Sequence, residues 1–286
     1  MKAAAFDYVR AHSVPEALEL LARHGPGAKL LAGGQSLLPA LNLRLSAPDI
    51  LIDISAIAAL SGIAVSPNGL RIGALTRHAD LLASHDLKHH APLLAQAITH
   101  VAHPAIRSRG TIGGSLANAD PAAELPACAL ALQARMIADS ARGQRVIAAS
   151  DFFTGLFETA LADDEILTAI DIPAPSPNDV YGFAELSRRS GDYAIVGLAV
   201  QGRRQGDAFC ELRLAYFSVG TRAALASYAA GVLVNGGSID EAMAALSDDL
   251  APHDDLQASA ATRLHLARVL LRRVVSGMRP SQEQAA

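Results

Sequence analysis

Residues 29–54 read KLLAGGQSLLPALNLRLSAPDILIDI, and residues 107–127 read RSRGTIGGSLANADPAAELPA. Each stretch contains an adjacent glycine pair, at 33–34 and 113–114, with a serine soon after it. Glycine adopts positive φ readily and lets a ligand approach the backbone without a Cβ in the way. Exposed N–H groups in such turns, or at a helix start, favour phosphate oxygens. The two segments together predict a site that holds both phosphates of one dinucleotide from two sides.

Each glycine pair is also compatible with a simple tight turn that binds nothing. Neither stretch has the GxGxxG spacing of a Rossmann dinucleotide-binding fold, and the chain contains no GK[ST] P-loop. A nicotinamide site of the Rossmann type is therefore disfavoured, whereas a dinucleotide site of another type remains a hypothesis.

Three polar residues follow the second glycine pair and are candidates for ligand contact. Asn118, Asp120 and Glu124 offer oxygen atoms that can accept hydrogen bonds from ribose or ribityl hydroxyls. Asp120 is equally well placed to cap a helix opened by Pro121, a residue type that is common at the first helical position. The two roles are compatible, and the sequence supports both.

Strand and helix patterns mix in both halves of the chain, which predicts an α+β fold rather than a regular alternation. In the first half, Ser13 and Glu16 form a capping pattern for a helix that ends near Gly25. Further helices are expected at 76–83, 91–101 and 121–132. Strands are expected at 28–32, 49–54 and 165–172, with a hairpin at 62–74.

A stretch with three prolines, residues 172–179, is the strongest linker candidate. Beyond it we expect strands at 181–186, 194–203 and 209–219, then a helix capped by Ser238 with Glu241, and a long amphipathic helix at 260–275. The chain therefore divides into two predicted domains, 1–175 and 178–286.

The composition excludes several classes of protein. A net charge near −4 does not indicate the basic surface that nucleic-acid binding requires. No apolar run reaches the roughly 18 residues of a spanning helix, and the N-terminus lacks the apolar stretch of a signal peptide, so a cytoplasmic location is expected.

The chain also lacks a metal-ligand pattern. Its two cysteines, Cys128 and Cys210, are too few for an iron–sulfur cluster and are expected to be buried apolar residues. The histidines at 85, 89, 90, 100 and 103 have no acidic or cysteine partner at ligand spacing, so no metal site is expected.

Beyond the glycine stretches, three further segments occur in order: GALTRHADL at 73–81, DEILTAIDIP at 164–173 and ELSRRSGDYAIVGLAV at 185–200. Together with the first two stretches they resemble the FAD-binding medium subunit of the molybdenum hydroxylases, the xanthine dehydrogenase and aerobic carbon monoxide dehydrogenase family. The resemblance covers essentially the whole chain. It implies a two-lobed FAD-binding domain of the vanillyl-alcohol oxidase type, followed by a small α+β C-terminal domain.

The resemblance also implies a set of cofactor-binding residues. The pyrophosphate would lie between residues 30–37 and 111–115, and Tyr193 would lie beside the isoalloxazine. Glu124 stands where the family usually has aspartate, which keeps the carboxylate and lengthens its reach by one methylene group. The full implied set is Leu30, Leu31, Ala32, Gly33, Gly34, Gln35, Ser36, Leu37, Val101, Thr111, Ile112, Gly113, Gly114, Ser115, Asn118, Asp120, Glu124, Leu167 and Tyr193.

The implied function is electron transfer within an oxidoreductase. FAD would be bound non-covalently, with [2Fe–2S] clusters on a small partner subunit and molybdopterin on a large one, in a doubled heterotrimer, that is, a heterohexamer. No residue of this chain would be catalytic, because substrate oxidation would take place on the large subunit. Two other hypotheses remain: a stand-alone flavin oxidase, which would need its own acid–base pocket, and a non-enzymatic dinucleotide-sensing module.

Overall fold

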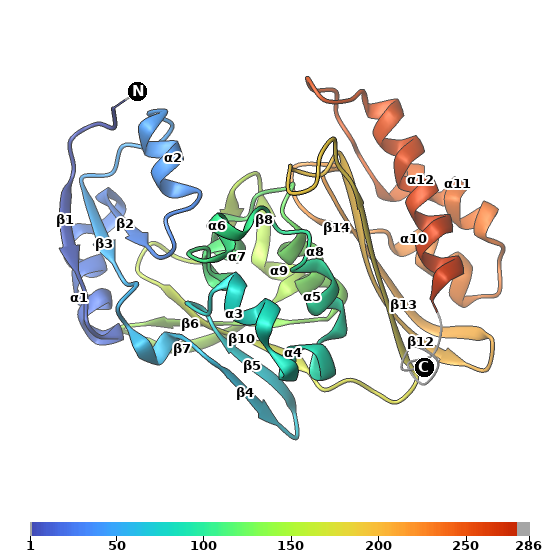
Figure 1. Ribbon diagram of the computed structural model, residues 1–286, viewed down its shortest axis with the longest axis horizontal. Helices are drawn as coiled ribbons and strands as arrows, with labels where there is room; N and C mark the ends of the chain where they lie inside the picture. The colour runs from blue at the N-terminus through green and yellow to red at the C-terminus, as the bar shows by residue number, and fades with distance from the viewer. Residues whose placement is uncertain (1, 279–286) are drawn as a thin grey trace.

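The computed structural model describes residues 2–278 and arranges them as three lobes in chain order (Figure 1). The N-terminal lobe lies on the left of the view, the middle lobe at the centre and the C-terminal lobe on the right. Among residues 2–278, no helix is both long enough and apolar enough to span a membrane.

The N-terminal lobe is a parallel three-stranded sheet of order β1-β3-β2 with one main helix. The central strand is buried at every position, which explains its three successive apolar residues Ile50, Leu51 and Ile52. The buried Asp53 that ends it accepts hydrogen bonds from Tyr8 and Arg10. The helix begins where Ser13 Oγ accepts a hydrogen bond from Glu16 N at 3.3 Å. The elements are β1 (Asp7–Arg10), α1 (Val14–His24), η1 (Gly25–Gly27), β2 (Ala28–Leu31), α2 (Leu37–Asn42), β3 (Ile50–Asp53) and η2 (Ala58–Leu60).

The middle lobe contains a five-stranded antiparallel sheet of order β4-β5-β10-β6-β7 and a group of short helices. Its strands are β4 (Ile63–Ser66), β5 (Gly69–Gly73), β6 (Arg135–Ser140), β7 (Gly143–Ala148) and β10 (Ile166–Pro173), with a small hairpin of β8 (Phe153–Gly155) and β9 (Glu158–Thr159). Its helices are α3 (His78–Ala83), α4 (His85–His90), α5 (Pro92–Ala97), α6 (Pro104–Arg107), α7 (Ile112–Asn118), α8 (Glu124–Ala131) and α9 (Ala149–Phe152).

The C-terminal lobe is a four-stranded antiparallel sheet of order β11-β12-β13-β14 with three helices on its outer face (Figure 1). Alternate side chains of its strands enter two different cores, so both faces of the sheet are buried. The elements are β11 (Asp179–Leu186), β12 (Val196–Gln205), β13 (Ala208–Phe217), β14 (Ala224–Leu225), α10 (Ser227–Val234), α11 (Ile239–Asp249) and α12 (Ala260–Gly277).

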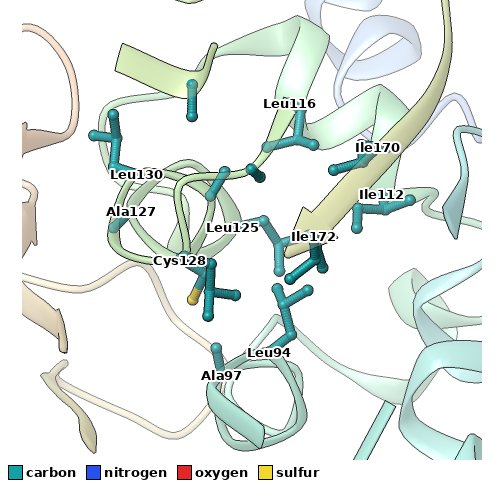
Figure 2. Packing of buried hydrophobic residues seen from close by; sticks show 14 of the residues in the cluster. Leu94, Ala97, Ile112, Leu116, Leu125, Ala127, Cys128, Leu130, Ile170 and Ile172 are labelled. Carbon is teal, nitrogen blue, oxygen red and sulfur yellow. The ribbon is translucent and has the colours of Figure 1, made fainter. Parts of the chain in front are cut away.

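Helix α8 is the centre of the core that joins the middle and C-terminal lobes. All of its residues after Glu124 are buried, and it packs against β12 and β13 as well as α5. Figure 2 shows Leu125 and Cys128 of α8 beside Leu94 of α5 and Ile172 of β10. A helix that is apolar all round must be covered on every side, and here the C-terminal lobe supplies part of the cover.

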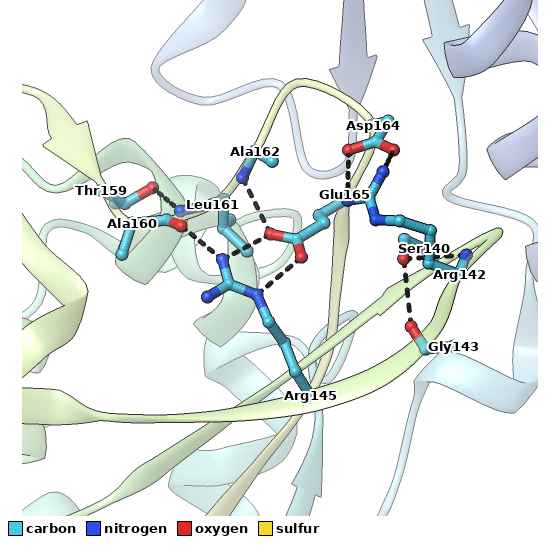
Figure 3. Close-up of polar contacts among 10 residues, drawn as sticks. All are labelled: Ser140, Arg142, Gly143, Arg145, Thr159, Ala160, Leu161, Ala162, Asp164 and Glu165. Atoms are coloured by element: carbon cyan, nitrogen blue, oxygen red, sulfur yellow. Dashed lines mark hydrogen bonds and ion pairs between the residues drawn. The ribbon is translucent and has the colours of Figure 1, made fainter.

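An ion pair fixes the connection that enters β10 (Figure 3). Arg145 on β7 donates from Nε to Glu165 Oε1 at 2.6 Å and from Nη2 to Glu165 Oε2 at 2.7 Å. The same carboxylate accepts from Ala162 N at 2.8 Å. The Glu165 side chain is almost fully buried, and these charge-assisted bonds satisfy it there. Arg142 pairs with Asp164 on the same connection.

The structure confirms most of the expected elements, including the hairpin at 62–74, the capping box of Ser238 with Glu241 and the long last helix. The short helices α4 and α6 were not predicted. The expectation for the cysteines is correct for Cys128, which is buried, and wrong for Cys210, which is exposed on β13. The proline-rich stretch forms only a short connection between β10 and β11.

The C-terminal sheet packs one face against the middle lobe, and the packing on that face requires a glycine at position 197. Phe217 lies directly across from Gly197 in the β12–β13 register and is fully buried. A methyl group at Gly197 would overlap the Phe217 ring. That ring stacks on Phe183, with ring centroids 5.9 Å apart, so it has little freedom to move.

We expect Gly197→Ala to lower the free energy of unfolding by about 1–3 kcal/mol, the usual cost of overpacking a core. The matched control is Gly231→Ala in α10, where an added Cβ meets nothing within 4 Å. In a helix interior that change stabilises by roughly 1 kcal/mol. Urea denaturation of both variants measures the difference, and equal stability of the two would contradict this account of the sheet face.

Candidate functional site

The two glycine segments lie against each other although they are far apart in the sequence. Gly33 has no room for a side chain, because a Cβ there would overlap the carbonyl oxygen of Arg109 and lie 2.9 Å from Gly110 Cα. A Cβ on Gly114 would lie 3.9 Å from that of Ala32. The N-terminal and middle lobes therefore meet at these segments.

The first segment presents a run of free backbone donors. In the described part of the chain, none of the six successive N–H groups from Ala32 to Leu37 donates a hydrogen bond to the protein. Gly34 has φ +72°, and the chain turns there between β2 and α2. Successive free N–H groups around such a left-handed residue form a concavity that binds anions. The Gln35 amide donates to Gly33 O at 3.0 Å and supports the turn.

The second segment differs from the expectation. Its glycine pair lies in the first turn of α7 rather than in a turn of its own. Ile112 N donates to Thr76 O at 3.1 Å, Gly113 N to Ala74 O at 2.8 Å and Gly114 N to Thr111 Oγ1 at 3.1 Å. The prediction of exposed N–H groups is therefore wrong for Ile112, Gly113 and Gly114. What this segment offers a ligand is the bare surface of Gly114 and the half-buried Ser115.

Asp120 shapes the turn that follows α7. Its Oδ1 accepts a hydrogen bond from Ala122 N at 2.9 Å. Helix α8 begins at Glu124 with Ala123 as its N-cap, so the prediction that Asp120 caps a helix opened by Pro121 is wrong. The aspartate instead fixes a turn that leaves Asn118 and Asp120 half-buried beside the second glycine segment.

Tyr193 belongs to the C-terminal lobe and lies beside Asp120 of the middle lobe. Its side chain is 59% exposed. Loss of hydration around its hydroxyl, followed by the nearby carboxylates of Asp120 and Glu124, raises the pKa of Tyr193 to about 12. The hydroxyl therefore stays protonated and lies next to Asp120, while much of the residue remains open to a ligand.

The apolar members of the expected set have different positions. Val101 and Leu167 are 7% and 6% exposed and belong to the main core. Arg107 Nη1 donates to Val101 O at 2.9 Å, which fixes the backbone of that loop. Leu30 and Leu31 lie half-buried in β2, just before the free N–H groups. Val101 and Leu167 are thus core residues, whereas Leu30 and Leu31 border the free N–H groups.

His100 and Glu185 are two ionisable residues close to Glu124 that the sequence did not single out as part of the site. His100 Nδ1 lies 3.4 Å from Glu185 Oε1, a contact between the loop after α5 and strand β11. Burial raises the pKa of Glu124 to about 7, with a further contribution from the charge of Glu185. No sequence signal joins these residues, because strand pairing and lobe packing alone bring them together.

Two family models together match almost the whole chain. The family described as "FAD binding domain in molybdopterin dehydrogenase" matches residues 4–175. The family described as "CO dehydrogenase flavoprotein C-terminal domain" matches residues 181–278.

Curated relatives agree with these matches. The 6-hydroxypseudooxynicotine dehydrogenase complex subunit alpha of Paenarthrobacter nicotinovorans is 47% identical over 199 residues, which cover 70% of this chain and 67% of the relative. The carbon monoxide dehydrogenase medium chain of Hydrogenophaga pseudoflava is 34% identical over 275 residues, which cover 95% of this chain and 96% of the relative.

Solved structures extend the likeness to the fold. A chain of the carbon monoxide dehydrogenase from Hydrogenophaga pseudoflava superposes with a TM-score of 0.92 at 35% identity, covering 96% of this chain and 98% of that one. A chain of quinoline 2-oxidoreductase from Pseudomonas putida 86 gives 0.90 at 36% identity, covering 96% and 97%. The chain therefore belongs to the FAD-binding medium subunits of the molybdopterin hydroxylase family, with an α+β FAD-binding domain followed by the C-terminal domain of that family, and is a subunit of an oxidoreductase complex.

Proposed function

We propose that this chain binds FAD non-covalently across its two glycine segments, receives electrons from [2Fe–2S] clusters on a small partner subunit and passes them to an external acceptor. Substrate oxidation would take place on a large molybdopterin subunit. The observation that carries the proposal is that, within residues 2–278, the six N–H groups from Ala32 to Leu37 have no protein partner and lie directly opposite a glycine-bearing helix start.

The residues present fit FAD. The free N–H groups of the first segment suit the two negative charges of a pyrophosphate. Gly114 leaves open the side that faces Ala32, and the Ser115 hydroxyl adds a polar group there. Asn118 and Asp120 offer oxygen atoms to ribityl or ribose hydroxyls. Tyr193 would place its exposed ring beside the isoalloxazine.

When bound, FAD supplies the two-electron chemistry that the side chains of this chain lack. The chain itself would neutralise the phosphate charges, orient the ring system and leave one edge open to each electron partner. We assign binding to the whole set implied by the resemblance, with Val101 and Leu167 as parts of the buried floor. The proposed division into domains is 1–175 for binding and 178–286 for the C-terminal domain.

The proposed partners follow from the cysteine count and the names of relatives. A chain with only two cysteines needs a partner to carry any iron–sulfur cluster. Relatives are named as a medium chain and as a subunit of a complex. These names support one small and one large partner, and we propose a doubled heterotrimer.

The first prediction of the proposed function is that the flavin leaves the protein on denaturation. N–H groups and side-chain oxygens would hold it, and these contacts are lost when the chain unfolds. No covalent bond would then keep the flavin on the protein. Acid precipitation of the purified complex should release all the yellow colour into the supernatant. Flavin that stays with the pellet would contradict non-covalent binding, and a complex without flavin would contradict the assignment itself.

The second prediction concerns Gly114. Gly114→Ala places a methyl group on the surface that faces the first segment, where the Thr111 hydroxyl must move slightly from 2.8 Å. We expect the Kd for FAD to rise about tenfold or more, equal to about 1.4 kcal/mol, with little loss of stability. Gly231→Ala, a helical glycine in open space, is the matched control.

Fluorescence titration with FAD measures both Kd values, and equal affinities would mean that the second segment is structural only. Gly34 is a poorer probe, because at φ +72° any side chain strains the backbone by about 1–3 kcal/mol.

The third prediction separates an electron-transfer subunit from a stand-alone oxidase. We expect the isolated flavoprotein to show at most a weak NADH- or dye-linked reaction and no reduction by an organic substrate. Addition of the small and large subunits should restore substrate-driven bleaching of the flavin in stopped-flow absorbance. Rapid bleaching of the isolated chain by an organic substrate would favour the oxidase hypothesis instead.

A further inference from the structure

The loop between β11 and β12 crosses from the C-terminal lobe to the middle lobe. It spans residues 187–195 and carries Tyr193, and Ile195 N closes it with a hydrogen bond to Leu186 O at 2.7 Å. Gly191 lies two residues before Tyr193 and has φ +85°, a backbone conformation that residues with a Cβ rarely adopt. The place of Tyr193 therefore depends on how the loop is held at residue 191.

Gly191 rests on a turn of the middle lobe. A Cβ on Gly191 would lie 2.4 Å from His103 Cε1, 2.6 Å from His103 Nδ1 and 3.1 Å from Ala102 O. A side chain at residue 191 would therefore displace either the His103 ring or the loop itself. We call this contact of Gly191 with Ala102 and His103 the loop seat.

The turn that forms the loop seat is itself held in a strained conformation. Ala102 has φ +45°, which is uncommon for a residue other than glycine. Arg107 Nη1 donates to Val101 O at 2.9 Å and to Ala102 O at 2.8 Å, so one guanidinium binds both carbonyl groups of the turn. Backbone strain persists only where the surrounding structure holds it, and strained residues cluster beside ligand sites. The turn therefore gives the loop a fixed support.

Tyr193 depends on this support because most of its side chain is not packed in a core. The side chain is 59% exposed, and only its hydroxyl lies next to Asp120 of the middle lobe. The shared core fixes the two lobes, but an exposed ring takes its place from the backbone that carries it. For Tyr193 that backbone is the loop whose contact with the middle lobe is Gly191.

We propose that Gly191 is a positioning residue: its contact with Ala102 and His103 sets the distance between the Tyr193 ring and the isoalloxazine. The inference rests on the proposed function, in which Tyr193 lies beside the isoalloxazine. Gly191 acts only through Tyr193 and needs no contact of its own with the cofactor. A phenol ring stacked on a flavin stabilises its binding and quenches its fluorescence, so a displaced Tyr193 changes both.

The test is the fluorescence of the flavin bound in the assembled complex, normalised to flavin content. Gly191→Ala should raise it by the same factor as Tyr193→Ala, because either change separates the phenol ring from the isoalloxazine. Loss of one aromatic stacking contact should also raise the Kd for FAD about two- to tenfold in each variant. The variant with both changes should be no brighter than Tyr193→Ala, whereas a merely structural role for Gly191 would add to its effect.

Two more variants make the test specific. Gly206→Ala adds the same methyl group at φ +63° in the turn at the other end of β12, where nothing lies within 4 Å of it. This control strains the backbone without touching the middle lobe and should leave the fluorescence unchanged. His103→Ala, combined with Gly191→Ala, removes the ring that the new methyl group overlaps and should return the fluorescence towards the wild-type value.

The loop seat can also be loosened from the other side. Arg107→Met removes the donor that holds Val101 O and Ala102 O and leaves Gly191 in place. It should brighten the flavin in the wild-type background and have no effect in the Tyr193→Ala background. Wild-type fluorescence in Arg107→Met would overturn the inference even if Gly191→Ala does not assemble.

The outcomes distinguish the two proposals. A complex without flavin overturns the proposed function, and wild-type fluorescence in Tyr193→Ala overturns the proposed place of Tyr193. If Tyr193→Ala is brighter while Gly191→Ala stays at the wild-type value, only the role of Gly191 is overturned. Equal brightness of Gly191→Ala with and without His103→Ala also overturns that role, because the contact would not be the cause.

Discussion

The packing of the C-terminal sheet against α5 and α8 is the contact on which the rest of the molecule depends. On this face Glu185, Gly197 and Phe217 lie side by side on three neighbouring strands. The absent side chain of Gly197 makes room for the Phe217 ring, and Phe183 stacks on that ring and supports His100. One glycine in a strand therefore controls how closely the two domains approach. Because α8 is buried on every side, the FAD-binding domain depends on this cover for part of its own core.

The same packing places the groups of the candidate site. Tyr193 and Glu185 belong to the second domain, yet both act beside residues of the first. Their position relative to Asp120 and Glu124 is set by a shared apolar core rather than by a flexible linker. A close-packed interior resists small shifts, so the polar groups at its edge keep their geometry. This explains how a site can be built from two domains that are joined by a short, proline-rich connection.

The two glycine segments, similar in sequence, perform different physical tasks. In the first, the backbone turns at Gly34 and leaves six N–H groups without a partner among the residues that the structure describes. In the second, the donors of Ile112 and Gly113 hold the segment to the residues around Thr76, and the glycines serve close packing. Unpaired donors need water or a ligand, whereas paired donors provide rigidity. One segment thus presents free donors, and the other forms the wall against which it is placed.

The sequence by itself determined the local elements and the identity of the candidate site. Capping residues at Ser13 and Ser238, the hairpin at 62–74 and the apolar strands follow rules that act over a few residues, and such rules can be read from the chain. The glycine pairs and the resemblance located the first segment. Only the tertiary structure decided which N–H groups remain free, that α8 begins at Glu124, and that Cys210 is exposed. It alone also brought His100 and Glu185 together, because their contact arises from domain packing across 85 residues of chain. Hydrogen-bond partners and burial are properties of that packing, and no local pattern encodes them.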